Sequence, residues 1–181
     1  ILNERKQLIN QSGLEWSVVE SVPIHQDIKL RNGNYQGLIT NYCQTLINLG
    51  ELGVTRVCYN FMPVVDWTRT NLNFEINNTS SALRFEMADF VAYDIHILKR
   101  HNASSDYDEI QLANAEERFL QMTASDKAEL ESNIIAGLPG GEGSYTRESI
   151  TRAIEDFRGI GTEGLRANLI AFLQDILPTA E

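Results

Sequence analysis

Two β-rich segments flank a long helical segment near the start of the chain, and this order constrains the fold most. Leu14–Glu20 and Val54–Tyr59 are rich in β-branched and aromatic residues, whereas Asn34–Leu52 places its apolar residues at helical spacing. A helical crossover of more than a dozen residues is typical of two parallel strands in one sheet. Parallel sheets have both faces covered and need further strands, so we expect partner strands that these 181 residues do not contain.

The remainder of the chain changes character and is predicted to be mainly helical. Ser21–Gly33, which holds Pro23, and Asn60–Ser81 are predicted to be loops because turn-forming and polar residues dominate them. The Gly-rich residues 137–144 are predicted to be a linker between helices. Five further helices are expected, at Leu83–Arg100, Asp108–Met122, Ser125–Gly137, Thr146–Arg158 and Thr162–Leu177.

Both ends of the chain lie inside helical patterns. The sequence begins at Ile1 without Met and without a capping residue, and it stops at Glu181 as a helix finishes. We therefore expect that the chain is part of a longer protein.

Composition excludes several classes of partner. Fifteen Lys and Arg residues against 25 Asp and Glu residues give a net charge of −10, which disfavours binding to a phosphate backbone. We expect no nucleic-acid partner, and no membrane span because no run of about 18 apolar residues occurs. Two cysteines, Cys43 and Cys58, are too few for a disulfide framework, so we expect a reduced, cytoplasmic compartment.

Two motifs that often bind cofactors or metals have weak support here. Gly159–Gly164 matches the glycine pattern of dinucleotide-binding turns, but the preceding segment is predicted to be a helix, whereas that motif follows a strand. A turn between two helices is the better interpretation. His96 and His101 are five residues apart, not the four that place two ligands on one helical face, so a metal site built from histidines is not expected.

Polar side chains follow the two predicted strands at the point where each strand ends. Glu20 and Ser21 close the first strand, Asn60 and Phe61 close the second, and His25 follows a few residues after the first. In parallel sheets such positions face the mouth where ligands bind. The alternatives are a cap on the following loop for Glu20 and Asn60, core packing for Phe61, and a solvated loop histidine for His25.

A carboxylate, an indole and a guanidinium lie together in the loop after the second strand, as Asp66, Trp67 and Arg69. The planar guanidinium of Arg69 suits a carboxylate substrate because it offers a fork of donors. An Asp66–Arg69 ion pair that stiffens the loop is an equal alternative.

Two long segments resemble D-mannonate dehydratase. They are residues 16–29 (WSVVESVPIHQDIK) and 57–70 (VCYNFMPVVDWTRT), with shorter matches at 133–140 (NIIAGLPG) and 176–181 (ILPTAE). The similarity extends over essentially the whole chain. The resemblance implies an α/β fold, a (β/α)8 TIM barrel of the xylose-isomerase-like type. Residues 1–181 would be part of its catalytic domain, with a helical insertion at about 74–160 after the second visible strand.

The resemblance also implies a reaction and its participants. D-mannonate would lose water to give 2-dehydro-3-deoxy-D-gluconate in hexuronate breakdown, with a divalent ion such as Mn²⁺ or Fe²⁺. The family's metal ligands lie beyond Glu181, so we expect none in this segment. Glu20 and His25 are the predicted catalytic residues, which would orient the substrate or shuttle protons. The predicted substrate-binding residues are Ser21, Asn60, Phe61 and Arg69.

Two other functions stay open at this point. A sugar isomerase or epimerase on the same barrel is one, because a fold does not determine a reaction. A noncatalytic helical interaction module, formed by Leu83–Arg158, is the other. The same helices could pack between subunits, and we expect a homo-oligomer.

Overall fold

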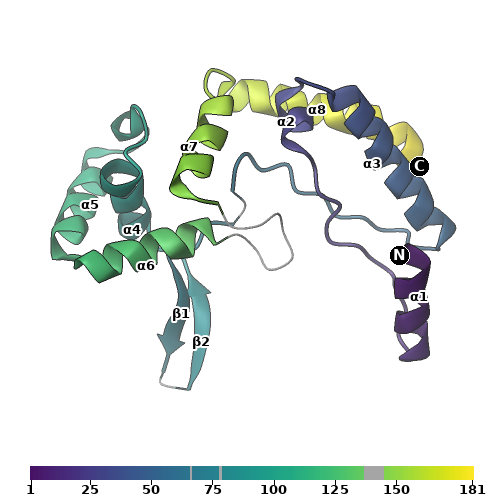
Figure 1. Ribbon diagram of the computed structural model, residues 1–181, viewed down its shortest axis with the longest axis horizontal. Coiled ribbons are helices and arrows are strands. Elements are labelled where there is room, and N and C mark those ends of the chain that lie inside the picture. The colour runs from purple at the N-terminus through teal and green to yellow at the C-terminus, as the bar shows by residue number, and fades with distance from the viewer. Residues whose placement is uncertain (66, 78, 137–144) are drawn as a thin grey trace. The chain divides into compact units, whose positions relative to one another are not determined.

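The computed structural model describes residues 1–65, 67–77, 79–136 and 145–181, which divide into two compact units (Figure 1). The first unit comprises Ile1–Pro63 and Asp156–Glu181, and the second comprises Val64–Glu155. Helices dominate both, and the second also holds a two-stranded antiparallel sheet. In the described residues, no helix has the length and apolar character that crossing a membrane requires.

The first unit is built on four helices, α1 (Leu2–Gln11), α2 (Gln26–Leu30), α3 (Tyr35–Glu51) and α8 (Gly161–Ala180). The helices predicted around α3 and α8 are confirmed, and Gly53, with a φ of 76°, follows the end of α3. Helix α8 packs against both α2 and α3. The buried side chains at these contacts form one core, made of Ile24, Ile28, Ile39, Tyr42, Phe172 and Ile176.

The two predicted strands pair in parallel, but over one bridge only. Val19 and Val57 form this bridge, in which the Val19 amide donates to the Arg56 carbonyl at 3.0 Å and the Cys58 amide donates to the Val19 carbonyl at 2.9 Å. The predicted direction of pairing is therefore confirmed, whereas the predicted strands of six and seven residues are wrong. A parallel pair gains stability from strands and helices on all sides, and the first unit offers no further strand among its described residues.

The loop predicted at Asn60–Ser81 is partly wrong, because a hairpin occupies its second half. Strand β1 (Asn71–Ile76) pairs antiparallel with β2 (Ser80–Arg84), and Phe74 lies opposite Ala82. The alternation of apolar residues along β1 is the period-two signal of a strand, and the many Asn residues around it hid that signal. The loop predicted at Ser21–Gly33 is also interrupted, by α2.

The second unit continues with short helical elements, of which most were predicted. The helix expected from Leu83 begins later, as α4 (Met87–Ala92) followed by the π-helix η1 (Tyr93–Ile97) and the 3₁₀-helix η2 (Ala103–Asp106). The predicted α5 (Glu109–Gln121), α6 (Ala124–Ile135) and α7 (Arg147–Asp156) are confirmed within one or two residues. The linker predicted at 137–144 lies outside the described residues. The core of this unit consists of Val91, Ala92, Tyr93, Ala115, Met122, Leu130 and Ile134.

Candidate functional site

The parallel bridge brings two of the predicted site residues into contact. The side-chain amide of Asn60 donates to the hydroxyl oxygen of Ser21 at 3.3 Å, across 39 residues of sequence. The bridge between Val19 and Val57 sets this meeting, because each side chain follows its bridge residue by two or three positions. Both residues are half-buried, so each is partly accessible to a ligand.

Glu20 and Phe61 lie beside this pair and differ in their surroundings. Glu20 is exposed and precedes Ser21 through a cis peptide bond. The ring of Phe61 packs against Phe172 of α8, with 5.6 Å between ring centroids. Phe61 therefore packs in the core, which was the alternative to a ligand-binding role. Asn60 directly precedes it and so lies next to the core.

His25 caps the N-terminus of α2. Its Nδ1 accepts a hydrogen bond from the backbone amide of Asp27 at 3.1 Å, and its carbonyl accepts from the Ile28 amide. Residues that cap helices are commonly Ser, Thr, Asp or Asn, so a capping histidine is unusual. The alternative of a solvated loop histidine is incomplete, because about half of the His25 side chain is exposed but its Nδ1 is engaged in the cap.

Helix α2 is held firmly at its other end, which fixes the position of His25. Arg31 pairs with Asp175 of α8 at 3.0 Å, and its guanidinium lies 4.7 Å from the ring centre of Tyr35. The side-chain amide of Asn168, also on α8, donates to the Lys29 carbonyl at 2.8 Å. Residues that are distant in sequence, and that sequence reasoning did not single out, thus support the loop that carries His25.

Gly33 allows the carboxylate of Asp27 to lie close to the backbone. A Cβ atom at Gly33 would come within 2.7 Å of Asp27 Oδ2, and its φ of 53° is one that glycine adopts easily. The Asn32 amide donates to the Asp27 carbonyl at 3.1 Å, which closes the turn after α2. The arrangement keeps Asp27 Oδ1 3.7 Å from Nδ1 of His25.

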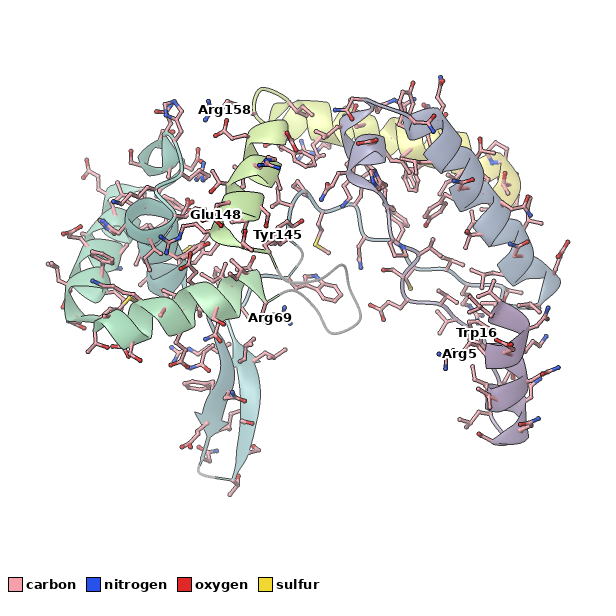
Figure 2. The ribbon with its side chains drawn as sticks, in the orientation of Figure 1. Arg5, Trp16, Arg69, Tyr145, Glu148 and Arg158 are labelled. Carbon is pink, nitrogen blue, oxygen red and sulfur yellow. The ribbon has the colours of Figure 1, made fainter. Side chains whose placement is uncertain are left out.

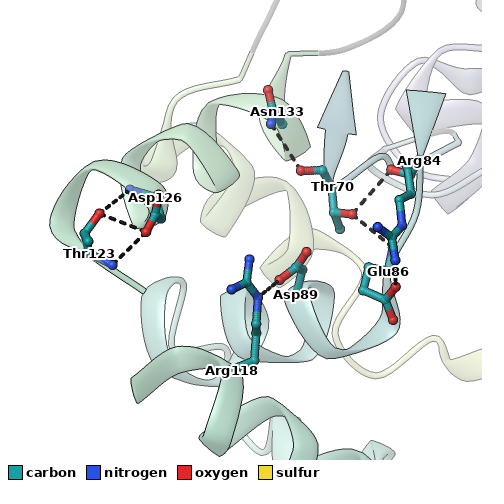
Figure 3. Close-up of polar contacts among 8 residues, drawn as sticks. All are labelled: Thr70, Arg84, Glu86, Asp89, Arg118, Thr123, Asp126 and Asn133. Atoms are coloured by element: carbon teal, nitrogen blue, oxygen red, sulfur yellow. Dashed lines mark hydrogen bonds and ion pairs between the residues drawn. The ribbon is translucent and has the colours of Figure 1, made fainter. Parts of the chain in front are cut away.

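Arg69, labelled in Figure 2, belongs to the second unit and lies outside its helices and strands, as predicted. Its side chain is buried. It directly precedes Thr70, whose backbone amide donates to the Arg84 carbonyl at 2.9 Å and whose hydroxyl accepts from the Glu86 amide at 2.9 Å. Asn133 donates to the Thr70 carbonyl at 3.1 Å (Figure 3). These contacts fix the backbone at Arg69. The predicted partner, Asp66, lies outside the described residues.

Comparison with known proteins establishes the family. The family model described as D-mannonate dehydratase (UxuA) matches residues 1–181. The chain belongs to the D-mannonate dehydratase family. A mannonate dehydratase from Saccharophagus degradans is 56% identical over 180 residues, which cover 99% of this chain and 45% of that protein. Mannonate dehydratase 2 from Agrobacterium fabrum is 53% identical over 178 residues, 98% of this chain and 45% of that protein.

A solved member of the D-mannonate dehydratase family has a similar structure. The crystal structure of mannonate dehydratase from Streptococcus suis serotype 2 superposes with a TM-score of 0.63 and 30% sequence identity, covering 99% of this chain and 37% of that one. The chain therefore spans less than half the length of the family members that it matches. The resemblance found in the two long motifs is confirmed.

This segment of a D-mannonate dehydratase family member does not by itself offer a metal site in the residues described. No group of three or more His, Cys, Asp or Glu side chains lies close enough there to hold an ion. His96 instead pairs with Glu116 at 3.1 Å and stacks on Phe119 with 4.5 Å between ring centroids. The donor set of the divalent ion that the family implies thus does not fit these residues alone.

The glycine pattern at Gly159–Gly164 connects α7 to α8, as predicted, and the element directly before it is therefore a helix. Gly159 and Gly161 have positive φ values of 88° and 65°, which the turn between the helices requires. In a dinucleotide-binding turn, the helix follows a strand and its N-terminus points at the pyrophosphate. The turn between α7 and α8 lacks this arrangement, so the glycine pattern does not indicate cofactor binding.

Proposed function

We propose that the full-length protein containing this chain dehydrates D-mannonate to 2-dehydro-3-deoxy-D-gluconate. The observation that carries the proposal is the match to the D-mannonate dehydratase family over all 181 residues, with relatives named mannonate dehydratase at 49–56% identity. The contact between Ser21 and Asn60 supports it, because the predicted site residues at the two segment ends do meet. We propose further that the chain is part of a (β/α)8 barrel. The parallel bridge between Val19 and Val57 supports this, because the strands of such a barrel pair in parallel.

The reaction requires groups that stabilise negative charge. Removal of the proton on the carbon next to the carboxylate builds an enediolate, and departure of the neighbouring hydroxyl as water leaves an enol that becomes the 2-keto acid. Fixed hydrogen-bond donors near the developing charge are typically worth about 3–4 kcal/mol each. Asn60 has such a donor, because its amide carries two N–H groups and Ser21 uses one of them.

The proposed roles follow the chemistry of each side chain. Asn60 and Arg69 bind the sugar acid through its hydroxyl and carboxylate oxygens, with Ser21 and Phe61 beside Asn60. Glu20 and His25 orient the substrate or move protons near the leaving hydroxyl. The role of Arg69 rests on the resemblance and on the chemistry of its guanidinium.

Residues outside this chain are proposed to hold the metal, Mn²⁺ or Fe²⁺, since the described residues do not form its site. A cytoplasmic location and a homo-oligomer also remain proposals. Two free cysteines suit a reducing compartment. Exposed apolar side chains near the hairpin, Leu83, Phe85 and Met87, suit packing against another subunit.

An assay of the full-length protein with D-mannonate tests the proposal directly. The protein is treated with EDTA and then supplied with Mn²⁺ or Fe²⁺, and the formation of a 2-keto acid is measured. We expect product only with added metal. Absence of a 2-keto acid with either metal would refute the dehydratase function, and interconversion of an aldose with a ketose would favour the isomerase alternative.

Replacement of Asn60 tests its place in the site. We expect Asn60→Ala to lower kcat/KM by about 10²–10³-fold, the usual cost of losing a fixed donor. Asn41→Ala, on the exposed surface of α3, is the matched control and should leave kcat/KM unchanged. An Asn60→Ala enzyme with unchanged kcat/KM would remove Asn60 from the proposal.

A further inference from the structure

The ring of His25 uses one of its two nitrogens, Nδ1, to cap α2. Nδ1 accepts the hydrogen bond from the Asp27 amide at 3.1 Å. About half of the side chain is exposed, and the structure gives Nε2 no hydrogen-bond partner in residues 1–65, 67–77, 79–136 and 145–181. Nε2 is therefore available to a ligand.

The capping bond decides which nitrogen carries the proton. A nitrogen that accepts a hydrogen bond bears no proton, so in this geometry Nδ1 is bare and the neutral ring has its hydrogen on Nε2. A proton on Nδ1 would point at the amide hydrogen of Asp27. The nearest carboxylate oxygen, Asp27 Oδ1, lies 3.7 Å from Nδ1, which is too far for a hydrogen bond.

The Nε2–H group of His25 is held in place from two sides. The cap fixes the ring to the first turn of α2, and the contacts of Arg31 and Lys29 with α8 fix the other end of that helix. A donor that is already positioned pays little entropy when a ligand binds. The complementary ligand group is an oxygen that accepts hydrogen bonds, such as a carboxylate or hydroxyl oxygen.

We propose that His25 acts as a fixed, neutral hydrogen-bond donor that contacts an oxygen of the sugar acid through Nε2, and that it does not carry protons during the reaction. This inference rests on the proposed dehydratase function. A neutral imidazole can polarise an oxygen through its N–H without transferring the proton. If it protonated the leaving hydroxyl it would become an imidazolate anion, so that proton comes from another group.

Two substitutions separate the two nitrogens of His25. In His25→Asn the amide oxygen lies near the position of Nδ1, and Asn is among the best capping residues, so the cap is kept and the distal donor is lost. In His25→Gln the amide nitrogen lies near the position of Nε2, so the distal donor is kept and the cap is lost. We expect His25→Asn to retain the Tm but lose about 10²-fold in kcat/KM. We expect His25→Gln to have a lower Tm but at least tenfold more activity than His25→Asn.

The outcomes of this pair decide the proposal. A His25→Asn enzyme that is as active as His25→Gln, or more active, would show that His25 only caps α2 and would overturn the inference. A wild-type protein without D-mannonate turnover would refute the proposed function, and with it the substrate named here.

The tautomer can be measured independently of activity. In the full-length protein labelled with ¹⁵N histidine, the His25 resonances are assigned by their absence in His25→Asn. We expect an unprotonated Nδ1 and a protonated Nε2 in the folded enzyme at assay pH. A protonated Nδ1, in either a neutral or a charged ring, would overturn the inference even if the dehydratase activity is present.

Discussion

The two units satisfy their polar groups in different ways. In the second unit, the buried carboxylate of Asp94 accepts two hydrogen bonds from Arg100 Nε and one each from Arg100 Nη2 and the Tyr107 hydroxyl, at 2.7–3.1 Å. These partners lie within 13 residues of sequence. In the first unit, the extended segments share a single parallel bridge, and α2 depends on residues of α8 that are about 140 positions away.

This difference shows in which unit residues close in sequence are enough to satisfy the polar groups. Helices α5 and α6 each begin with a capping box, in which the side chains and backbones of the first turn satisfy each other. The first unit has no such box in its described helices, and its core forms only when distant segments meet around Phe172. We expect the second unit to respond to changes in local polar contacts and the first to changes in long-range packing.

The largest expected effect follows from removal of Phe172. Its side chain is fully buried and contacts the rings of Tyr42 and Phe61, at 5.2 and 5.6 Å between centroids. We expect Phe172→Ala to lower the free energy of unfolding by about 3–5 kcal/mol, measured by denaturant titration of the full-length protein. Burial raises the pKa of Tyr42 to about 12, and this pKa should fall toward its ordinary value in the variant.

Phe74→Ala is the matched control in the second unit, because Phe74 is 37% exposed. Its cost should be well below that of Phe172→Ala. Equal costs for the two variants would contradict the contrast in long-range packing between the units.

A smaller effect is expected from Asp94→Asn, which tests the local polar cluster of the second unit. The change removes the charge from hydrogen bonds to Arg100 and Tyr107, and we expect a loss of about 1.5–3 kcal/mol in the free energy of unfolding. The pKa of Tyr107 is raised by burial and by its bond to Asp94, so it should fall but remain above its ordinary value. Titration followed by NMR measures this pKa.

Asp106→Asn is the control for Asp94→Asn, because it also removes a carboxylate charge beside Arg100, but at an exposed position. Asp106 also contacts Arg100, at 2.8 Å, but its side chain is mostly exposed. Exposed ion pairs contribute about 0–1 kcal/mol, so this variant should be close to the wild type. If it cost as much as Asp94→Asn, burial would not explain the strength of the cluster.

The smallest effect concerns the capping box at Thr123. Thr123→Ala should cost about 1 kcal/mol, the typical value for a lost cap, whereas Ser125→Ala on the exposed first turn of α6 should cost less. The backbone amide and the hydroxyl of Thr123 both lower the pKa of Asp126. The variant should therefore bring this pKa closer to its ordinary value, as measured by NMR titration.

The sign of the pH dependence follows from that lowered pKa. The folded state binds the proton of Asp126 more weakly than the unfolded state, so its stabilisation is present above the ordinary pKa of about 3.8 and is lost as the pH falls. A Thr123→Ala variant that loses the same stability between pH 5 and pH 2 as the wild type would contradict this assignment.

Several parts of the fold were accessible from the sequence, because the signals are local. The apolar spacing of α3 and the helical patterns over α5 and α6 predicted these helices within two positions. The direction of the pairing between Val19 and Val57 followed from the length of the connecting helix. The hairpin was missed because polar residues around β1 obscure its alternation.

Part of the candidate site was also accessible from the sequence. The meeting of Ser21 and Asn60 follows once parallel pairing is recognised, since both residues end their segments. The capping role of His25 was not predicted, because histidine is rarely a cap and because α2 is only five residues long. So short a helix is not stable by itself, and its support comes from Asn168 and Asp175.

The sequence by itself determined the family, the longer helices and the pair of segments that carry the candidate residues. Only the tertiary structure decided where α2, the helix that His25 caps, is held. The physical reason is distance along the chain. Helical periodicity and capping act within a few residues, whereas the position of α2 depends on hydrogen bonds with α8 that no local pattern records.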